Sequence, residues 1–261
     1  MVGRLLWEQD AAGSSPVTST KIREISRKVC FSIFLFVSSV EALALKKVLF
    51  CDKIRRTNLF WRDVMRSYTI MPKTGDWKDI PVAPIDTRLW TPEVDIVSTA
   101  QVCYDTEALY LRLCSKEKDI RAVEEGRIGV PSKDSCLEFF FSPEEGDVRY
   151  FNFEFNPALC MHIGFGSCRY DSARILPKPS ANINSEVVRT EDGWVLTYQI
   201  TFAFIRQFFP NFTPTPGKKM RANFYKCGEL TPVEHYFSWN PVETPTPDFH
   251  RPEYFGELIF G

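Results

Sequence analysis

A strict alternation of phenylalanine with polar residues between positions 149 and 156 constrains the fold more than any other feature of the sequence. Phe151, Phe153 and Phe155 alternate with Asn152, Glu154 and Asn156. Successive side chains of a β-strand point to opposite faces, so this period of two predicts a strand with one apolar and one polar face. The apolar face has to be buried against another layer, which favours a domain of packed sheets.

Nine further segments have the length and pattern of strands. They span residues 99–104, 108–115, 135–142, 159–165, 184–189, 194–200, 220–227, 234–239 and 255–260. Gly, Pro, Asn and Asp between them mark hairpins and turns. Residues 201–208 carry the one convincing helix pattern, which Pro210 ends. The sequence therefore predicts an all-β fold, a β-sandwich or jelly roll of about ten strands with one short helix.

The first 64 residues differ from the rest and are not expected to belong to this fold. They carry 11 basic and 6 acidic residues, and a basic stretch at 21–28 precedes an apolar run at 29–45. Together these features mimic a secretory signal. The run is short for a membrane-spanning helix, and Glu41 interrupts it.

A different interpretation of this segment is favoured. Residues 1–20 resemble the peptide obtained when a transfer-RNA gene is translated by mistake, which makes Met65 or Met71 the true first residue. Residues 1–64 are then a non-native extension, and 65–261 form one domain in the cytoplasm. A signal peptide at 21–45, which implies secretion, and a membrane anchor remain the alternatives.

Eight cysteines are present, none of them in a Cys-x-x-Cys arrangement. The three histidines (His162, His235 and His250) do not lie at a spacing that suggests a zinc site. Several cysteines lie inside apolar strand segments, a pattern typical of buried free thiols in a reducing compartment. We therefore expect no disulfide, no metal and no other cofactor.

Charge and aromatic content indicate the kind of partner. Residues 65–261 carry 21 basic and 27 acidic residues, and this acidic body has no basic stripe, which argues against nucleic acid. No membrane contact is expected of the mature domain. Aromatic residues interleaved with amides and charged groups at 221–228, 235–241 and 248–252 suit a mono- or oligosaccharide instead. The apolar face of a sugar stacks on such rings while its hydroxyls form hydrogen bonds.

Seven residues are the candidate sugar contacts. Phe249, in a Pro-rich loop, is the expected stacking platform, and His250 flanks it. The candidates for hydrogen bonds to hydroxyls are Asn152, Glu154, Arg169, Asn223 and Lys226. Each also has a structural explanation: Phe249 could plug the end of the sandwich, the 152–156 stripe could be a solvated sheet face, and Arg169 could form a surface ion pair.

The chain resembles the family 9 carbohydrate-binding modules, particularly their stand-alone bacterial branch, over residues 75–261. The resemblance is carried by the segments 134–140 (Asp-Ser-Cys-Leu-Glu-Phe-Phe), 150–157 (Tyr-Phe-Asn-Phe-Glu-Phe-Asn-Pro), 221–228, 237–241 and 249–256. It implies a β-sandwich that binds sugars without cleaving them, often at a chain end held between two aromatic rings. Calcium recurs in the family, but no Asp/Asn-rich loop here indicates a calcium site.

Two positions depart from the family pattern. Pro131-Ser132-Lys133 stands where the family commonly has a tryptophan, and Phe249 stands where the second stacking tryptophan is expected. One platform is thus missing and the other is smaller. Trp239 matches a family tryptophan that is expected in the core.

Two other classes of function remain alternatives. A glycoside hydrolase acting in carbohydrate catabolism would use Glu138 and Glu154 as its two carboxyl groups. The other is a haem-binding or structural sandwich module. Haem binding would use Met161 and His162, but neighbouring residues of one strand point to opposite faces and cannot both bind one iron from the same side.

Overall fold

The computed structural model describes residues 65–176 and 183–261, so the interpretations of residues 1–64 concern a segment outside the described residues. Val64–Gly261 is a compact unit by itself. Its strands are β1 (Ser67–Pro72), β2 (Ala83–Ile85), β3 (Thr87–Leu89), β4 (Val97–Tyr104), β5 (Ala108–Lys116), β6 (Cys136–Ser142), β7 (Tyr150–Phe155), β8 (Met161–Gly166), β9 (Ser172–Arg174), β10 (Ser185–Arg189), β11 (Gly193–Thr201), β12 (Lys219–Gly228), β13 (His235–Ser238) and β14 (Gly256–Phe260).

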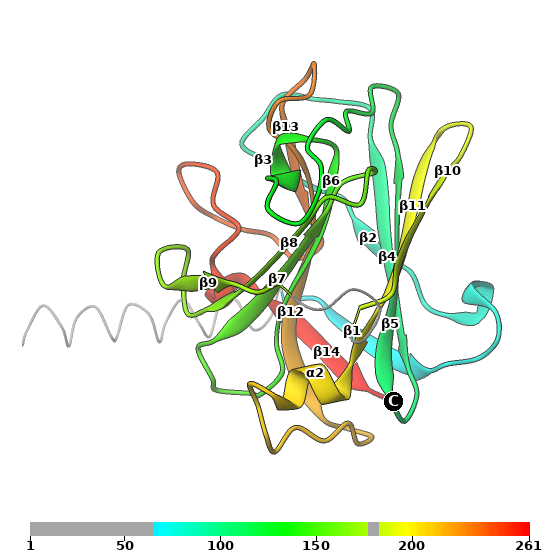
Figure 1. Ribbon diagram of the computed structural model, residues 1–261, viewed down its shortest axis with the longest axis vertical. Coiled ribbons are helices and arrows are strands. Elements are labelled where there is room, and N and C mark those ends of the chain that lie inside the picture. Colours follow the sequence, from blue (N-terminus) through cyan, green and yellow to red (C-terminus); the bar gives the residue numbers. More distant parts are fainter. Residues whose placement is uncertain (1–64, 177–182) are drawn as a thin grey trace, which may run out of the picture. The chain divides into compact units, whose positions relative to one another are not determined.

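These strands form two packed layers (Figure 1). The layer called sheet A here contains β1, β14, β12, β6, β7, β8 and β9 in that order, with β13 attached to β12 and β3 attached to β13. The layer called sheet B contains β10, β11, β5, β4 and β2. Strand β1 joins the layers, because residues 67–70 pair with β14 and residues 71–72 pair with β4. The predicted all-β sandwich is confirmed, with fourteen strands among the described residues.

The core lies between the sheets and follows the alternation seen in the sequence. Phe151, Phe153 and Phe155 of β7 are fully buried in one cluster with Leu109, Leu111 and Leu113 of β5. The rings of Phe139 and Phe141 stack at 4.8 Å between centroids beside them. All ten predicted strands are present within a few residues of their expected bounds.

The short helix and the additional strands refine that prediction. Helix α2 spans Phe202–Arg206, and the side chain of Thr201 caps it by accepting a hydrogen bond from Phe204 N. The strands absent from the prediction, β1, β2, β3 and β9, have three to six residues. Proline lies within or at the end of two of them, at Pro72 and Pro84, which masks the strand pattern. Among the described residues, no helix has the length and apolar character that crossing a bilayer requires.

The outer face of sheet A, turned away from the core, positions the candidate site. It carries the polar members of β7 together with a second buried aromatic cluster, of which Phe140, Tyr150, Tyr225, Tyr236 and Phe249 are the ring members at its centre. The segment after β13, residues 239–255, folds over this face and brings Phe249 onto it. An ordinary solvated sheet face therefore does not describe this side of the sheet.

Candidate functional site

A cavity of about 370 Å³ opens on the outer face of sheet A. Its floor is made by side chains of three neighbouring strands, namely Glu138 and Phe140 on β6, Glu154 on β7 and His162 on β8, with Cys227 of β12 beside them. Ligand pockets for small molecules usually have volumes of a few hundred Å³, about 300 to 1,000 Å³. The cavity has the size of a site for one or a few sugar units.

The floor follows from strand register. Tyr225 lies opposite Glu138, Glu138 opposite Glu154, and Glu154 opposite His162, so one row of residues crosses four strands. Directly opposed residues on one sheet face have Cβ atoms about 5 Å apart. Two carboxyl groups and an imidazole therefore stand side by side.

Burial sets the protonation of the floor. It raises the pKa of Glu138 well above its ordinary value, and the neighbouring Cys227 and Glu154 add to the increase. It raises the pKa of Glu154 to about 7, although Asn152 Nδ2 opposes this by donating a hydrogen bond to Glu154 Oε1 at 2.7 Å. The Glu138 carboxyl is therefore harder to ionise than an exposed one, because burial and the neighbouring groups disfavour its charged form.

One wall of the cavity, called the aromatic wall here, consists of Trp90, Tyr236 and Phe249. The Trp90 ring lies 5.6 Å from that of Tyr236 and 5.7 Å from that of Phe249, centroid to centroid. Trp90 is half-buried and held in place by its indole N–H, which donates to Thr244 O at 2.7 Å. Its backbone has a φ of 52°, an uncommon conformation for a bulky residue, which turns the chain after β3.

Two arginines also line the cavity, Arg174 on β9 beside the floor strand β8 and Arg169 in the loop before β9. Arg169 donates from Nε and Nη2 to one carboxylate oxygen of Asp248, at 3.2 and 3.0 Å. Arg174 donates to the carbonyl oxygens of Ile128, Gly129 and Met161, whereas its buried Nε has no partner among the described residues. Arg169 and Arg174 both line the cavity, and their charges act to lower the pKa of Glu154, against the larger effect of burial.

His250 completes the lining and is uncharged at neutral pH. Its Nδ1 forms a hydrogen bond with the Tyr150 hydroxyl at 2.9 Å, and its backbone N–H donates to Asp248 Oδ1. Burial lowers the pKa of His250 to about 4; Arg169 and His162 act in the same direction, and Asp248 opposes them.

This depressed pKa predicts a loss of stability in acid. The ordinary histidine pKa of 6.5 applies to the unfolded chain, so between pH 6.5 and about 4 the unfolded state binds more protons than the folded one. The contribution of neutral His250 is complete above pH 6.5 and is lost as the pH falls toward 4. Between pH 6.5 and 4 the unfolding free energy of a His250→Gln variant should fall by about 1–3 kcal/mol less than that of the wild type. Urea unfolding at several pH values measures this difference. If the unfolding free energies of the two proteins change equally with pH, the depressed pKa of His250 is contradicted.

The structure brings four of the seven candidate residues to one cavity, namely Glu154, Arg169, Phe249 and His250. Asn152 lies directly behind them, buried, and reaches the site only through Glu154. Its Oδ1 has no hydrogen-bond partner among the described residues. Phe249 is only 7% exposed, because its ring stacks on Tyr225 with 4.0 Å between centroids. Phe249 therefore completes the aromatic wall, and little of its ring is accessible for stacking against a ligand.

Asn223 and Lys226 are not part of the cavity. Asn223 is fully buried and joins β12 to the chain after β13, since its Oδ1 accepts from Phe224 N and Asn240 N and its Nδ2 donates to Asn240 O. Lys226 lies on the core side of β12. Its Nζ is 3.2 Å from a carboxylate oxygen of Glu117 and 2.7 Å from His235 Nε2.

Trp90 and Tyr236 of the aromatic wall are cavity residues that sequence reasoning missed as candidate contacts, and Trp90 is the more exposed of the two. The sequence indicates Trp90 only weakly. It precedes Thr91-Pro92 and directly follows a three-residue strand that the sequence pattern did not predict. Trp239 is buried at 2% exposure and packs on Phe224, as expected of a core residue. Met161 packs against the core whereas His162 lines the cavity, so these two side chains lie on opposite faces of β8.

Comparison with solved structures identifies the fold. A protein from Bacteroides uniformis ATCC 8492, named a "putative carbohydrate-binding protein", superposes with a TM-score of 0.62 and 26% identity over 75% of this chain and 98% of its own. A family 9 carbohydrate-binding module from Caldicellulosiruptor kristjanssonii superposes over 75% of this chain in two structures. Its complex with glucose gives a TM-score of 0.54, 9% identity and coverage of 96% of that chain. Its complex with cellotriose gives a TM-score of 0.53, 10% identity and coverage of 93% of that chain.

The sequence comparisons give the family directly. No curated protein matches the chain. The sequence profile of carbohydrate-binding family 9, however, matches residues 70–260, which is nearly the whole of the compact unit. This extent covers the cavity and both sheets, and it confirms the resemblance drawn from the strand motifs. The chain therefore belongs to carbohydrate-binding family 9.

Proposed function

We propose that the chain binds a mono- or oligosaccharide in the cavity on sheet A without cleaving it. The observation that carries this proposal is the arrangement of the lining: the aromatic wall of Trp90, Tyr236 and Phe249 closes the same cavity as the carboxyl and guanidinium groups. A sugar needs both, an apolar surface for its C–H face and directed partners for its hydroxyls. The glucose and cellotriose bound by the Caldicellulosiruptor module, which shares the fold, support this choice of ligand.

The geometry of the cavity supports the following proposed contacts. Trp90 supplies the stacking surface, because it is the half-buried ring of the wall whereas Phe249 and Tyr236 are each 7% exposed. Glu154 and Arg169, which both line the cavity, direct the hydroxyls, and His250 is a further hydrogen-bonding group of the lining. Trp90 thereby takes the place of the tryptophan that the chain lacks at residues 131–133.

The position of the carboxyl groups favours binding over hydrolysis. Glycoside hydrolases place two carboxyl groups on either side of the scissile bond, about 5 Å apart in retaining enzymes and farther in inverting ones. Glu138 and Glu154 instead stand next to each other on one sheet face, and Glu138 is 2% exposed and accepts a hydrogen bond from the Cys227 thiol. They approach a ligand from one side only.

Calorimetric titration of the reduced protein with glucose and with cellotriose tests both parts of the proposal. We expect saturable binding of at least one of them and no reducing ends released from cellotriose during prolonged incubation. A Glu154→Gln variant, which removes the charge and keeps the shape, should weaken binding by about tenfold, the cost of one hydrogen bond to a charged group. New reducing ends that disappear in this variant would instead establish a hydrolase.

A further inference from the structure

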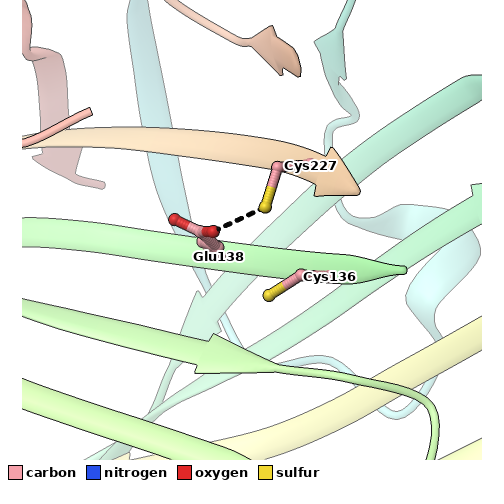
Figure 2. A group of neighbouring side chains, drawn as sticks. All are labelled: Cys136, Glu138 and Cys227. Carbon is pink, nitrogen blue, oxygen red and sulfur yellow. Dashed lines mark hydrogen bonds between the residues drawn. The ribbon is translucent and has the colours of Figure 1, made fainter. Parts of the chain in front are cut away.

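Two thiols and a carboxyl group meet beside the floor of the cavity, which Glu138 and Cys227 line and Cys136 does not. Cys136 Sγ, a carboxylate oxygen of Glu138 and Cys227 Sγ all lie within 4.8 Å of one another, and all three residues are buried. Figure 2 shows Cys227 directed from β12 toward Glu138 on β6, with Cys136 on the same strand as Glu138. The Cys227 thiol contacts Glu138 Oε1 at 3.0 Å.

Strand register creates this cluster. Cys136 and Cys227 are directly opposed on the neighbouring strands β6 and β12, and Glu138 follows Cys136 by two residues on the same face. Both strands have a further neighbour here, since β6 pairs with β7 and β12 pairs with β13, whose Tyr236 lies opposite Cys227. The three side chains therefore project from rigid elements. Such placement fixes ligand atoms better than a loop would.

The chemistry of the three groups indicates a cation and its class. Soft thiolates favour zinc and similar ions, whereas calcium and magnesium prefer sets of oxygen atoms only. Ligand atoms around a tetrahedral zinc ion lie 2.0–2.3 Å from the metal, so they are separated from each other by about 3–4 Å. The spacing of the cluster is compatible with that separation.

We propose that Cys136, Glu138 and Cys227 form a binding site for a thiophilic divalent cation such as Zn²⁺. Three protein ligands leave one position of a tetrahedral ion open. Cys227 and Glu138 also line the cavity, so the ion enters through it and the open position is available to water or to the opposed Glu154. The site needs no bound sugar and can be tested without one, although Glu138 and Cys227 line the cavity of the proposed carbohydrate binding.

The sequence conceals such a site because the ligands come from different strands. Metal-binding cysteines are usually recognised by short spacings along the chain. Here the two thiols are opposed across a sheet and lie far apart in sequence. The expectation of buried free thiols without metal is the competing description of the same residues, and the two can be distinguished by experiment.

Titration of the reduced, chelator-treated protein with Co²⁺ distinguishes them. Binding at the cluster should give one equivalent of bound cobalt, a sulfur-to-cobalt charge-transfer absorption, and d–d bands of the intensity typical of four-coordinate ions. Zn²⁺ should displace the cobalt and abolish both signals. Cobalt held by surface carboxylates or histidines gives no thiolate absorption, and that result in the wild-type protein would overturn the proposal.

Variants locate the site. Cys136→Ser and Cys227→Ser should each abolish the charge-transfer absorption and weaken Zn²⁺ binding by at least about a hundredfold, because loss of a mere supporting partner already costs 10- to 100-fold. Cys114→Ser is the matched control, a thiol on β5 of the other sheet, and should bind as wild type does. Equal spectra in all variants, or a Cys136–Cys227 disulfide that persists in reductant, would contradict the site. Glu138→Gln, which keeps its volume, tests the third ligand if a serine variant fails to fold.

Discussion

Replacement of Lys226 by methionine should lower the free energy of unfolding by about 3–5 kcal/mol, the cost of removing one partner from a buried ion pair. The Lys226 side chain is 0% exposed and that of Glu117 is 2% exposed, and Nζ lies 3.2 Å from the carboxylate. Burial alone raises the pKa of Glu117, but the charge of Lys226 and the hydrogen bonds from Trp194 and Ser135 outweigh it and leave the pKa lowered. Without Lys226 a buried negative charge loses its counter-ion.

The pair is expected to matter because it connects the two layers. Glu117 directly follows β5 of sheet B, and Lys226 lies on β12 of sheet A. Trp194 Nε1 of β11 donates to Glu117 Oε1 at 2.7 Å, and the Ser135 hydroxyl donates to Oε2 at 2.9 Å. Lys226 Nζ also donates to Cys227 O and to His235 Nε2. The ammonium group thus has a full set of partners beneath the cavity floor.

Two further variants make the test specific to the buried pair. Lys219→Met removes a lysine of the same strand whose ion pair with Glu257 is exposed, and it should cost less than about 1 kcal/mol. The double variant Lys226→Met with Glu117→Gln should recover part of the loss, because a neutral amide still accepts from Trp194. Urea unfolding followed by far-UV circular dichroism measures all three. A Lys226→Met loss no larger than that of Lys219→Met would show that the pair does not stabilise the fold.

The sequence predicted the fold well because the information is local. Alternation such as that of Phe151, Phe153 and Phe155 specifies both a strand and its buried face, and the structure buries these rings as expected. The same alternation placed Lys226 on one face with Ala222 and Phe224, which proved to be the core face. A lysine is expected there only when a buried partner neutralises it, and Glu117 lies on another sheet.

The site was less predictable because it depends on register and on long-range contacts. Glu154 and His250 meet in one cavity only through the pairing of β6 with β7 and the folding of residues 239–255 over the sheet. Asn223 has the residue type of a sugar contact, but its side-chain amide forms hydrogen bonds with the backbone of Asn240 instead. Trp90 reaches the aromatic wall through a backbone turn after β3 that the sequence pattern did not predict. Residue type alone could not separate these cases.

Trp90→Ala should weaken sugar binding by about 1–2 kcal/mol, which is about five- to thirtyfold in Kd. This prediction rests on the proposed function, and its reason is the exposure of the rings. Trp90 is half-buried at the mouth of the cavity and anchored by its hydrogen bond to Thr244 O, so its removal deletes stacking surface while the sheet beneath stays intact. Calorimetry with glucose and cellotriose measures the change.

Phe249→Ala is a less selective test of the aromatic wall than Trp90→Ala, because it affects stability as well as sugar binding. Its ring stacks on Tyr225 at 4.0 Å with an angle of 12° between the planes, so its loss opens a gap in a buried cluster and lowers stability as well as affinity. Trp77→Ala is the matched control, because Trp77 is also half-buried but lies on the short turn Trp77–Asp79 and not in the cavity. We expect Trp77→Ala to bind sugar as wild type does. If Trp90→Ala retains full affinity while Phe249→Ala loses it with no change in unfolding free energy, Phe249 is the stacking platform and Trp90 only closes the wall.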